Sequence, residues 1–377
     1  MWYITAVTRF RGGGNGGGLV RRLTILGVRF GGLIACVLAA DIAVAMYRAR
    51  RAPRVRILER GTGRLVHEPR PFAEQLQIIL VWGTVTGSWL LCRIPWFLRY
   101  LQERSIRAGQ EMDQPASADR IDAFVADYHV DVSELDRHPH EFSTVNELFS
   151  RPLRAGARPV ADPDDPAVAV SPTDGRLTCV DGVGPAHLLV KGRHRSVAAL
   201  LGITTAGAMV PGPGRVRAFH EAARVHGFSA AVCRLAPGDY HRFHWPVDGE
   251  WRPDEVLDLA GEYHSVAPVC IGGPVDVLGR NRRAVVMVGS EVFGEVAIVV
   301  VGAVKVAGIE LTAEPGIVSK GDEMGRFRYG GSTVVVVFRR GAIAFDPELV
   351  RNSSRGVETL VRVASVLGRA TASTGHA

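Results

Sequence analysis

The sequence GDEMGRFRYGGSTVVVVF (321–338) places two glycines, Gly330 and Gly331, immediately before Ser332. Glycine tolerates strained backbone angles, so the serine hydroxyl can be brought against the carbonyl that precedes it. Attack on the Gly331 carbonyl would convert the peptide bond into an ester. Elimination from Ser332 would then break the chain and leave dehydroalanine, and hydrolysis of that group would give a pyruvoyl cap. A plain turn before a buried strand is the other interpretation.

Such an attack needs activation of the serine, and two other stretches contain candidate groups. In SPTDGRL (171–177), Asp174 lies in a predicted tight turn that presents its carboxylate at the start of a strand. In APGDYHRFHWPVDG (236–249), His241 and His244 carry imidazoles, which titrate near neutral pH and suit proton transfer. The two histidines could also ligate a metal, but no third ligand follows at a recognisable spacing, so no metal is expected.

The positive charge of the chain is concentrated at its N-terminus. Residues 1–60 contain eleven Arg and two acidic residues, a net charge of +9, whereas the whole chain carries +7. The rest is therefore slightly acidic, which argues against a nucleic-acid-binding domain and favours a targeting segment or an anionic membrane surface as partner. Five scattered cysteines without a CxxC pair predict neither a disulfide framework nor a zinc site.

Apolar segments in the N-terminal third predict membrane contact. Residues 1–40 lack acidic residues and contain five Arg, a composition typical of a mitochondrial presequence or of a disordered basic tail. Residues 23–47 are long enough to cross a bilayer, with Arg29 and Asp41 towards opposite ends. Positive charge on both flanks leaves the orientation of this span open. Residues 76–92 form a shorter run that ends at CRIPWFLRY, which predicts an interfacial helix or, alternatively, a buried core helix.

The remainder of the chain predicts a few helices and then a β-rich body. The polar residues 109–119 form a candidate boundary, and Ser117 is a candidate N-cap for a helix over residues 121–128. From about residue 167, short β-branched runs separated by Gly and Pro are typical of strands. The runs VAIVVV and TVVVVF lack alternation, as expected for strands buried on both faces. We therefore expect an α+β fold with a β-rich body and short helices, preceded by a membrane-associated helical N-terminal region.

In this order, the three stretches resemble the phosphatidylserine decarboxylases, a family of pyruvoyl-dependent membrane enzymes. The resemblance covers about residues 60–340 and leaves out the N-terminal extension and the last few dozen residues. It includes further segments in the family's order: GTVTGSWLL (83–91), EFSTVNELFSRPLRAGARPV (141–160), KGRHRSVAALLG (191–202), GEYHSVAP (261–268) and VGAVKVAGI (301–309).

The resemblance implies a role for each candidate residue. Asp174, His244 and Ser332 would form the triad for self-cleavage. The cut would fall between Gly331 and Ser332 and would leave a large N-terminal β chain and a small C-terminal α chain, associated as a heterodimer. His241 would assist decarboxylation by handling a proton at the α-carbon of the substrate. The covalent cofactor would be a pyruvoyl group derived from Ser332, with no metal or diffusible cofactor.

The implied reaction converts phosphatidylserine to phosphatidylethanolamine and carbon dioxide. The pyruvoyl ketone would form a Schiff base with the substrate amine, and its conjugated carbonyl would accept the electrons released as carbon dioxide leaves. An anionic bilayer lipid as substrate suits the arginine-rich, apolar N-terminal third. The presequence-like start favours a mitochondrial inner membrane, while the predicted span also fits a bacterial inner membrane.

Three regions are expected: a basic targeting or transmembrane extension (1–60), a membrane-interface helical region (61–115) and the catalytic domain (116–377). The sequence departs from the family pattern at Arg282, where the family usually has Glu, and at Ala267, where it has Asn. Neither departure touches the triad. Two other functions are alternatives: a membrane-anchored serine hydrolase that uses the intact Asp, His and Ser, and a non-catalytic membrane scaffold.

Overall fold

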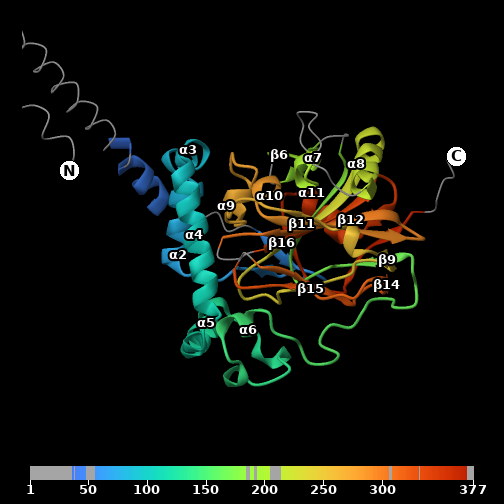
Figure 1. The fold of residues 1–377 in the computed structure, drawn as a ribbon, viewed down its shortest axis with the longest axis horizontal. Helices are drawn as coiled ribbons and strands as arrows, with labels where there is room; N and C mark the ends of the chain where they lie inside the picture. Colours follow the sequence, from blue (N-terminus) through green and yellow to red (C-terminus); the bar gives the residue numbers. More distant parts are fainter. Residues whose placement is uncertain are drawn as a thin grey trace, which may run out of the picture.

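The computed structural model describes residues 36–37, 39–47, 56–183, 187–190, 193–203, 214–304, 308–330 and 332–371. This part of the chain forms a β-rich body with a layer of helices along one side (Figure 1). The layer comes from the N-terminal third of the chain, and most of the other helices are short. The predicted α+β class with a β-rich body and short helices is therefore confirmed.

The body is built on an eleven-stranded sheet in the order β14-β9-β11-β12-β16-β7-β4-β18-β1-β2, with β10 also paired to β11. Its strands are antiparallel to their neighbours, except that β1 and β18 are parallel. They are β1 (Ile57–Glu59), β2 (Leu65–Val66), β4 (Gly175–Val183), β7 (Phe228–Leu235), β9 (Gly249–Trp251), β10 (Leu257–Leu259), β11 (Arg283–Ser290), β12 (Gly294–Gly302), β14 (Gly316–Val318), β16 (Ser332–Arg339) and β18 (Glu358–Val361).

The central strands β12, β16 and β7 are buried on both faces. Val296 to Val301 of β12 and Val334 to Phe338 of β16 are fully buried, and their side chains divide between two apolar clusters on opposite faces of the sheet. Helices and the smaller sheets cover those faces, so the apolar runs show no alternation, although the strands are antiparallel. The prediction that VAIVVV and TVVVVF form doubly buried strands is confirmed.

Three small sheets complete the β structure. One has the order β13-β15-β8 and a second the order β17-β19-β3, while β5 pairs with β6 alone. Their strands are β3 (Val168–Val170), β5 (His187–Val190), β6 (Arg193–Ser196), β8 (Arg242–His244), β13 (Ile309–Leu311), β15 (Glu323–Phe327), β17 (Ile343–Phe345) and β19 (Val366–Ala370).

The helical layer consists of α2 (Phe72–Trp82), α3 (Val85–Arg93) and α4 (Pro95–Met112), which Figure 1 shows beside the body. Ile78 and Trp82 of α2 belong to the same apolar cluster as Ile271 of α9, which joins the layer to the body. The other helices are α5 (Ile121–Tyr128), α6 (Val145–Phe149), α7 (Val197–Leu200), α8 (Gly214–His226), α9 (Pro268–Ile271), α10 (Val277–Arg280) and α11 (Pro347–Ser354). The 3₁₀ turns are η1 (Pro115–Arg120), η2 (Val132–Glu134), η3 (Pro139–Glu141) and η4 (Pro253–Glu255).

The helix predicted over residues 121–128 is present as α5, but the prediction that Ser117 caps it is wrong. Ser117 lies inside the 3₁₀ turn η1, and Arg120 precedes the helix without a capping hydrogen bond from its side chain. The Ser117 hydroxyl instead donates to the Met112 carbonyl and accepts from the Val145 amide. It therefore ties the end of α4 to the start of α6, a long-range role that local sequence cannot indicate.

The apolar run 76–92 is two helices rather than one. It breaks at Gly83, and Thr84 begins α3 as its N-cap, with its hydroxyl accepting from the Gly87 amide at 3.0 Å. Within the described part of the chain, no helix is long and apolar enough to cross a membrane. Most of the predicted span 23–47 lies outside the described residues, although residues 39–47 are helical.

Candidate active site

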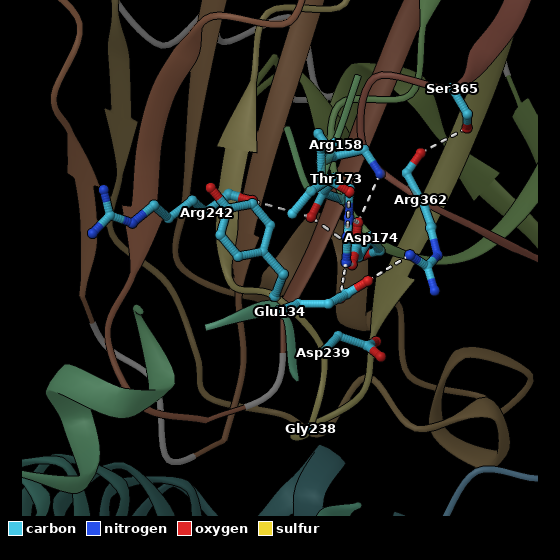
Figure 2. Close-up of polar contacts among 12 residues, drawn as sticks. Glu134, Arg158, Thr173, Asp174, Gly238, Asp239, Arg242, Arg362 and Ser365 are labelled. Carbon is cyan, nitrogen blue, oxygen red and sulfur yellow. Dashed lines mark hydrogen bonds and ion pairs between the residues drawn. The ribbon is translucent and has the colours of Figure 1, made fainter. Parts of the chain in front are cut away.

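Asp174 lies in the turn that leads into β4, as predicted. An Arg158 fork holds its carboxylate: Nε donates to Oδ1 at 3.0 Å and Nη2 donates to Oδ2 at 2.6 Å (Figure 2). The Val363 amide donates to Oδ1 at 2.7 Å. Nη2 of Arg158 also binds Glu134 at 2.8 Å, and these two carboxylates raise the pKa of the guanidinium against the opposing effect of burial. Two charge-assisted hydrogen bonds in a fork fix both the position and the plane of the Asp174 carboxylate.

Gly175, the next residue, allows this turn to lie against β7. It has a φ of +158°, and a Cβ atom there would lie 2.7 Å from the Arg234 carbonyl oxygen. That distance is too short for any other residue, because the obstacle is backbone. The turn carrying Asp174 is therefore packed directly on the strand that pairs with β16.

His244 ends β8, and its backbone amide donates to the Pro172 carbonyl at 2.7 Å, which attaches β8 to the Asp174 turn. Its Nδ1 atom lies 2.8 Å from the Gly321 carbonyl oxygen, which can only accept, so Nδ1 carries the proton. Nε2 then accepts from the Tyr240 hydroxyl at 3.0 Å. Burial lowers the pKa of His244, opposed by the Gly321 hydrogen bond and by the nearby charges of Glu323 and Asp174. The imidazole is thus a neutral base at physiological pH.

His241 lies in the loop after β7 and is fully buried, with 0% of its surface exposed. Its Nδ1 donates to the Asp239 carbonyl at 2.8 Å, and its ring stacks on Phe149 with 3.7 Å between centroids. Burial, followed by the charge of Arg151, holds the pKa of His241 well below its usual value of 6.5. Its Nε2 is buried and has no hydrogen-bond partner in the described part of the chain. The ring is therefore held in one orientation, with a basic nitrogen available.

Ser332 is the first residue of β16. It pairs with Gly302 of β12 on one side and with Leu235 of β7 on the other. The residue is 0% exposed, and its hydroxyl has no hydrogen-bond partner among the described residues. Gly330 has a φ of +130°, a conformation that residues with a side chain rarely adopt. Gly331, which carries the predicted cleavage site, lies outside the described residues.

The structure gathers these residues at one end of the central strands but does not link the predicted triad by hydrogen bonds. Asp174 and His244 are close together: the His244 amide binds Pro172, two residues before Asp174, and the charge of Asp174 affects the pKa of His244. However, the Asp174 carboxylate binds Arg158, and Nε2 of His244 binds Tyr240. Among the described residues, nothing is bonded to the Ser332 hydroxyl.

Sequence reasoning missed three residues that touch the candidate groups: Arg158, Tyr240 and Phe149. Tyr240 adjoins His241 within the stretch DYHRFH. Its position four residues before His244 could have indicated that its hydroxyl contacts that imidazole. Arg158 and Phe149 both lie in EFSTVNELFSRPLRAGARPV (141–160). Nothing in that segment indicates which distant carboxylate or ring each one meets.

A small pocket of about 30 Å³ lies beside Gly330. Arg70 lines it from the segment before α2, Glu74 from the first turn of α2, Tyr128 from α5, and Ser265 from the loop before α9. Further lining comes from Tyr329 and from Leu235, the residue paired with Ser332. A ligand here would therefore lie next to the predicted cleavage site, between the helical layer and the sheet.

In the described residues, no group of three His, Cys, Asp or Glu side chains is arranged to hold a metal ion.

Comparison with known proteins gives one consistent result. The profile of the phosphatidylserine decarboxylase family matches residues 145–368. Phosphatidylserine decarboxylase proenzyme 3 of Schizosaccharomyces pombe is 36% identical over 72% of this chain and 26% of its own length. Proenzyme 2 of Oryza sativa subsp. japonica is 34% identical over 87% of this chain and 50% of its own length. The proenzyme of Chlamydia felis is 35% identical over 66% of this chain and 78% of its own length. The chain thus spans half or less of the first two relatives.

Proposed function

Because the chain belongs to the phosphatidylserine decarboxylase family, we propose that it cuts itself between Gly331 and Ser332 and then converts phosphatidylserine to phosphatidylethanolamine and carbon dioxide. One observation carries this proposal. The Ser332 hydroxyl is buried at the start of a core strand, two residues after Gly330 with its positive φ, and has no partner among the residues that the structure describes. Buried hydroxyls usually have a hydrogen-bond partner, but the neighbouring Thr333 also lacks one among the described residues, so it is the place of Ser332 directly after two glycines that favours a nucleophilic role.

The proposed maturation proceeds in two stages. The Ser332 hydroxyl attacks the Gly331 carbonyl carbon and loses its proton, and the C–N bond breaks, so that the acyl group moves from nitrogen to oxygen as an ester. Loss of the Cα proton of Ser332 then expels the Gly331 carboxylate and leaves dehydroalanine on the new N-terminus. Addition of water and loss of ammonia convert that end into a pyruvoyl group. The products are the β chain, ending at Gly331, and the α chain, starting at position 332.

His244 is the proposed base of the first stage, because its Nε2 carries the free electron pair while Nδ1 is committed to Gly321. Nε2 accepts the Tyr240 hydroxyl in this structure, so that hydroxyl must either move aside or pass the Ser332 proton along. Asp174 acts through position and charge: its carboxylate lies near His244 and favours the imidazolium that forms during the attack. Arg158 fixes Asp174 in place.

The surroundings of Ser332 fit a pyruvoyl group. Ser332 is fully buried, and no side chain among the described residues is hydrogen-bonded to its hydroxyl oxygen. A pyruvoyl group supplies an electron sink for the carbon dioxide that leaves the substrate. His241 is neutral, and its Nε2 has no partner in the part of the chain that the structure describes, so it is the proposed group that moves a proton at the α-carbon of the substrate.

A serine hydrolase fits less well. Such an enzyme needs a nucleophile that substrate can reach and a base already in contact with it. Ser332 is fully buried, and the basic nitrogen of His244 is hydrogen-bonded to Tyr240.

The deciding experiment mixes the purified protein with phosphatidylserine vesicles, measures phosphatidylethanolamine and carbon dioxide, and labels the α chain with a carbonyl-reactive probe. A chain that stays whole and reacts with a fluorophosphonate at Ser332 would instead establish the hydrolase.

The rate of self-cleavage is expected to depend on pH through His244. Its pKa in the folded chain lies below the usual value of 6.5, so the imidazole stays neutral when an unfolded histidine would already be half protonated. The cleavage rate of freshly translated precursor should therefore be flat from pH 8 to about 6.5 and fall only at lower pH. The folded state should lose stability over the same acid range, because the unfolded chain takes up that proton first. A rate that already halves at pH 7 would contradict this assignment.

The helical layer is the proposed membrane-contacting surface, within an interface region of residues 61–115 that follows the extension 1–60 and precedes the catalytic domain 116–377. Trp89 of α3 is 55% exposed and Trp96 of α4 is 63% exposed. Tryptophan favours the interface between lipid headgroups and acyl chains, because its ring is apolar and its N–H is polar. We place the enzyme at a membrane, with the mitochondrial inner membrane favoured by the presequence-like start and a bacterial inner membrane as the alternative.

Replacing both Trp89 and Trp96 by serine should weaken binding to phosphatidylserine vesicles by about 10- to 100-fold, since partial burial of each ring is worth roughly 1 kcal/mol. Vesicle co-sedimentation measures the effect. Ile317, which is 91% exposed on β14 at the far side of the body, provides the control. Ile317→Ser should leave binding unchanged. Equal losses in the two variants would mean that the helical layer is not the contact surface.

A further inference from the structure

Lys320 lies in the turn between β14 and β15 and is a buried charged residue that the proposed mechanism does not use. Only 3% of its surface is exposed. Its ammonium group donates to three backbone carbonyls at the entry to β3, those of Asp162 at 2.7 Å, Asp165 at 2.5 Å and Val168 at 3.2 Å. A lysine ammonium has three N–H donors and no acceptor, so each donor has a partner here. Lys320 therefore ties its own turn to the segment that leads into β3.

The residue after Lys320 determines where the proton of His244 lies. The Gly321 carbonyl accepts from Nδ1 of His244 at 2.8 Å. Gly321 has a φ of +85°, a conformation that residues with a side chain rarely adopt. Two backbone hydrogen bonds attach this turn to β8: the Gly321 amide donates to the Trp245 carbonyl at 2.8 Å, and the Trp245 amide donates to the Asp322 carbonyl at 2.9 Å. The turn thus presents one backbone carbonyl to the imidazole.

His244 is held between two segments that Lys320 joins. Its backbone amide is bonded to the turn that carries Asp174, and its ring is bonded to Gly321. Because β3 leads directly into the Asp174 turn, the Lys320 ammonium fixes the Gly321 carbonyl relative to the segment that holds the main chain of His244. The Asp174 carboxylate is bound to an arginine instead. The acceptor for Nδ1 is therefore a backbone carbonyl and not the aspartate.

We propose that Lys320 is a positioning residue for self-cleavage: it fixes the Gly321 carbonyl so that His244 keeps its proton on Nδ1 and its electron pair on Nε2. A neutral imidazole that loses its acceptor at Nδ1 can carry the proton on Nε2 instead. That tautomer has no electron pair with which Nε2 could take the Ser332 proton. This inference rests on the proposed function, in which Nε2 of His244 is the base.

A purely structural role for Lys320 predicts a different result. Three hydrogen bonds from a buried ammonium stabilise the segment before β3, whatever the state of His244. If that were the whole role, replacing Lys320 would lower the melting temperature and would leave the tautomer of His244 unchanged. The tautomer is therefore the informative measurement, and stability alone is not.

The first experiment determines the tautomer of His244 by heteronuclear NMR in the full-length chain carrying Ser332→Ala, with isotope-labelled histidine. It is done at about pH 8, where an imidazole is neutral. The His244 signals are those that disappear in a His244→Gln spectrum. Nδ1 should carry the proton in this chain. Adding Lys320→Met, which nearly keeps the length of the side chain and removes its donors, should place the proton on Nε2 in a large fraction of the molecules.

The second experiment measures the cleavage rate of freshly translated precursor that retains Ser332. Lys320→Met should slow cleavage by about 10- to 100-fold, the loss that a small displacement of a catalytic group can cause. Release of carbon dioxide per cleaved chain should change far less, because His241 and not His244 is the proposed group in turnover. A loss of stability alone would lower the yield of folded protein without separating the two rates.

Arg369 provides the matched control, because it holds the same segment through a different contact. It lies on β19, and its guanidinium binds the carboxylates of Asp162 and Asp165, each at 2.7 Å. Arg369→Gln should therefore loosen the segment before β3 and still cleave at the normal rate, with the proton of His244 on Nδ1. Equal slowing by Arg369→Gln and Lys320→Met would overturn the proposal.

An unchanged tautomer in the Lys320→Met chain also overturns the proposal. Should that chain fail to fold, Lys320→Gln, which keeps two N–H donors on a shorter side chain, decides in its place. It should show the same shift of tautomer and the same slowing to a smaller degree, and the absence of both would count against Lys320. Failure of the proposed function has a different signature: an unsubstituted chain that stays whole and releases no carbon dioxide, although the tautomer of His244 still depends on Lys320.

Discussion

A chain carrying Ser332→Ala is expected to remain in one piece and to release no carbon dioxide from phosphatidylserine. The change removes one oxygen atom from a fully buried residue, and that hydroxyl has no partner among the described residues, so the fold should be intact. Without it there is no nucleophile for the Gly331 carbonyl and no atom from which a pyruvoyl group can form. Gel electrophoresis of the purified protein and a carbon dioxide assay measure the two losses.

Thr333 offers a closely matched control. It follows Ser332 on β16, is also fully buried, and also has a hydroxyl without a partner in the described part of the chain. Thr333→Val removes that hydroxyl at nearly constant volume in a strand that favours β-branched residues. It should cleave as the unsubstituted chain does. If Thr333→Val blocked cleavage as fully as Ser332→Ala, disturbance of β16 would explain both results and the nucleophile would be unassigned.

The second large effect is expected at His241 and should separate maturation from turnover. His241→Asn should cleave normally but decarboxylate about 10²- to 10⁴-fold more slowly, the usual contribution of a general acid or base. Asparagine can still donate a hydrogen bond to the Asp239 carbonyl, as Nδ1 of the histidine does, but it has no counterpart of Nε2. The experiment therefore removes the proton-transfer atom and keeps the anchor.

Cleavage is read on a gel and turnover from carbon dioxide release by the same preparation. Phe149→Leu serves as the comparison, because it removes the stacking partner of His241 and leaves both ring nitrogens in place. Its loss of turnover should be much smaller. A His241→Asn chain that fails to cleave would place His241 in maturation, and one that turns over at the full rate would remove it from the mechanism.

The core strands and the turn carrying Asp174 could be predicted from sequence because local pattern determines them. The runs in β12 and β16 are apolar at every position, which leaves no solvent face, and Asp174 precedes a glycine whose backbone must pass close to β7. The break between α2 and α3 was also encoded locally, since Gly83 and the capping residue Thr84 are adjacent. The continuous apolar content of residues 76–92 favoured a single helix, so the break at Gly83 and Thr84 was not predicted.

The partners of the candidate residues could not be predicted, because they depend on contacts between distant segments. Arg158 reaches Asp174 only because the loop before β3 folds back over the turn, and nothing in its spacing distinguishes it from other arginines. The position of Glu74 in the pocket wall could not be predicted for the same reason. The signal for a helix start is local, whereas the place of Glu74 beside Gly330 depends on how α2 packs on the body.

The most direct test of whether the chain makes its own catalytic group by self-cleavage is the intact mass of the unaltered protein purified from cells. Self-cleavage predicts two polypeptides, one ending at Gly331 and one starting at position 332 and lighter by one ammonia than its encoded sequence. That smaller chain should resist N-terminal sequencing and react with a carbonyl reagent. A single polypeptide of the full encoded mass that still forms phosphatidylethanolamine from phosphatidylserine would show that the catalytic group does not come from cleavage at Ser332.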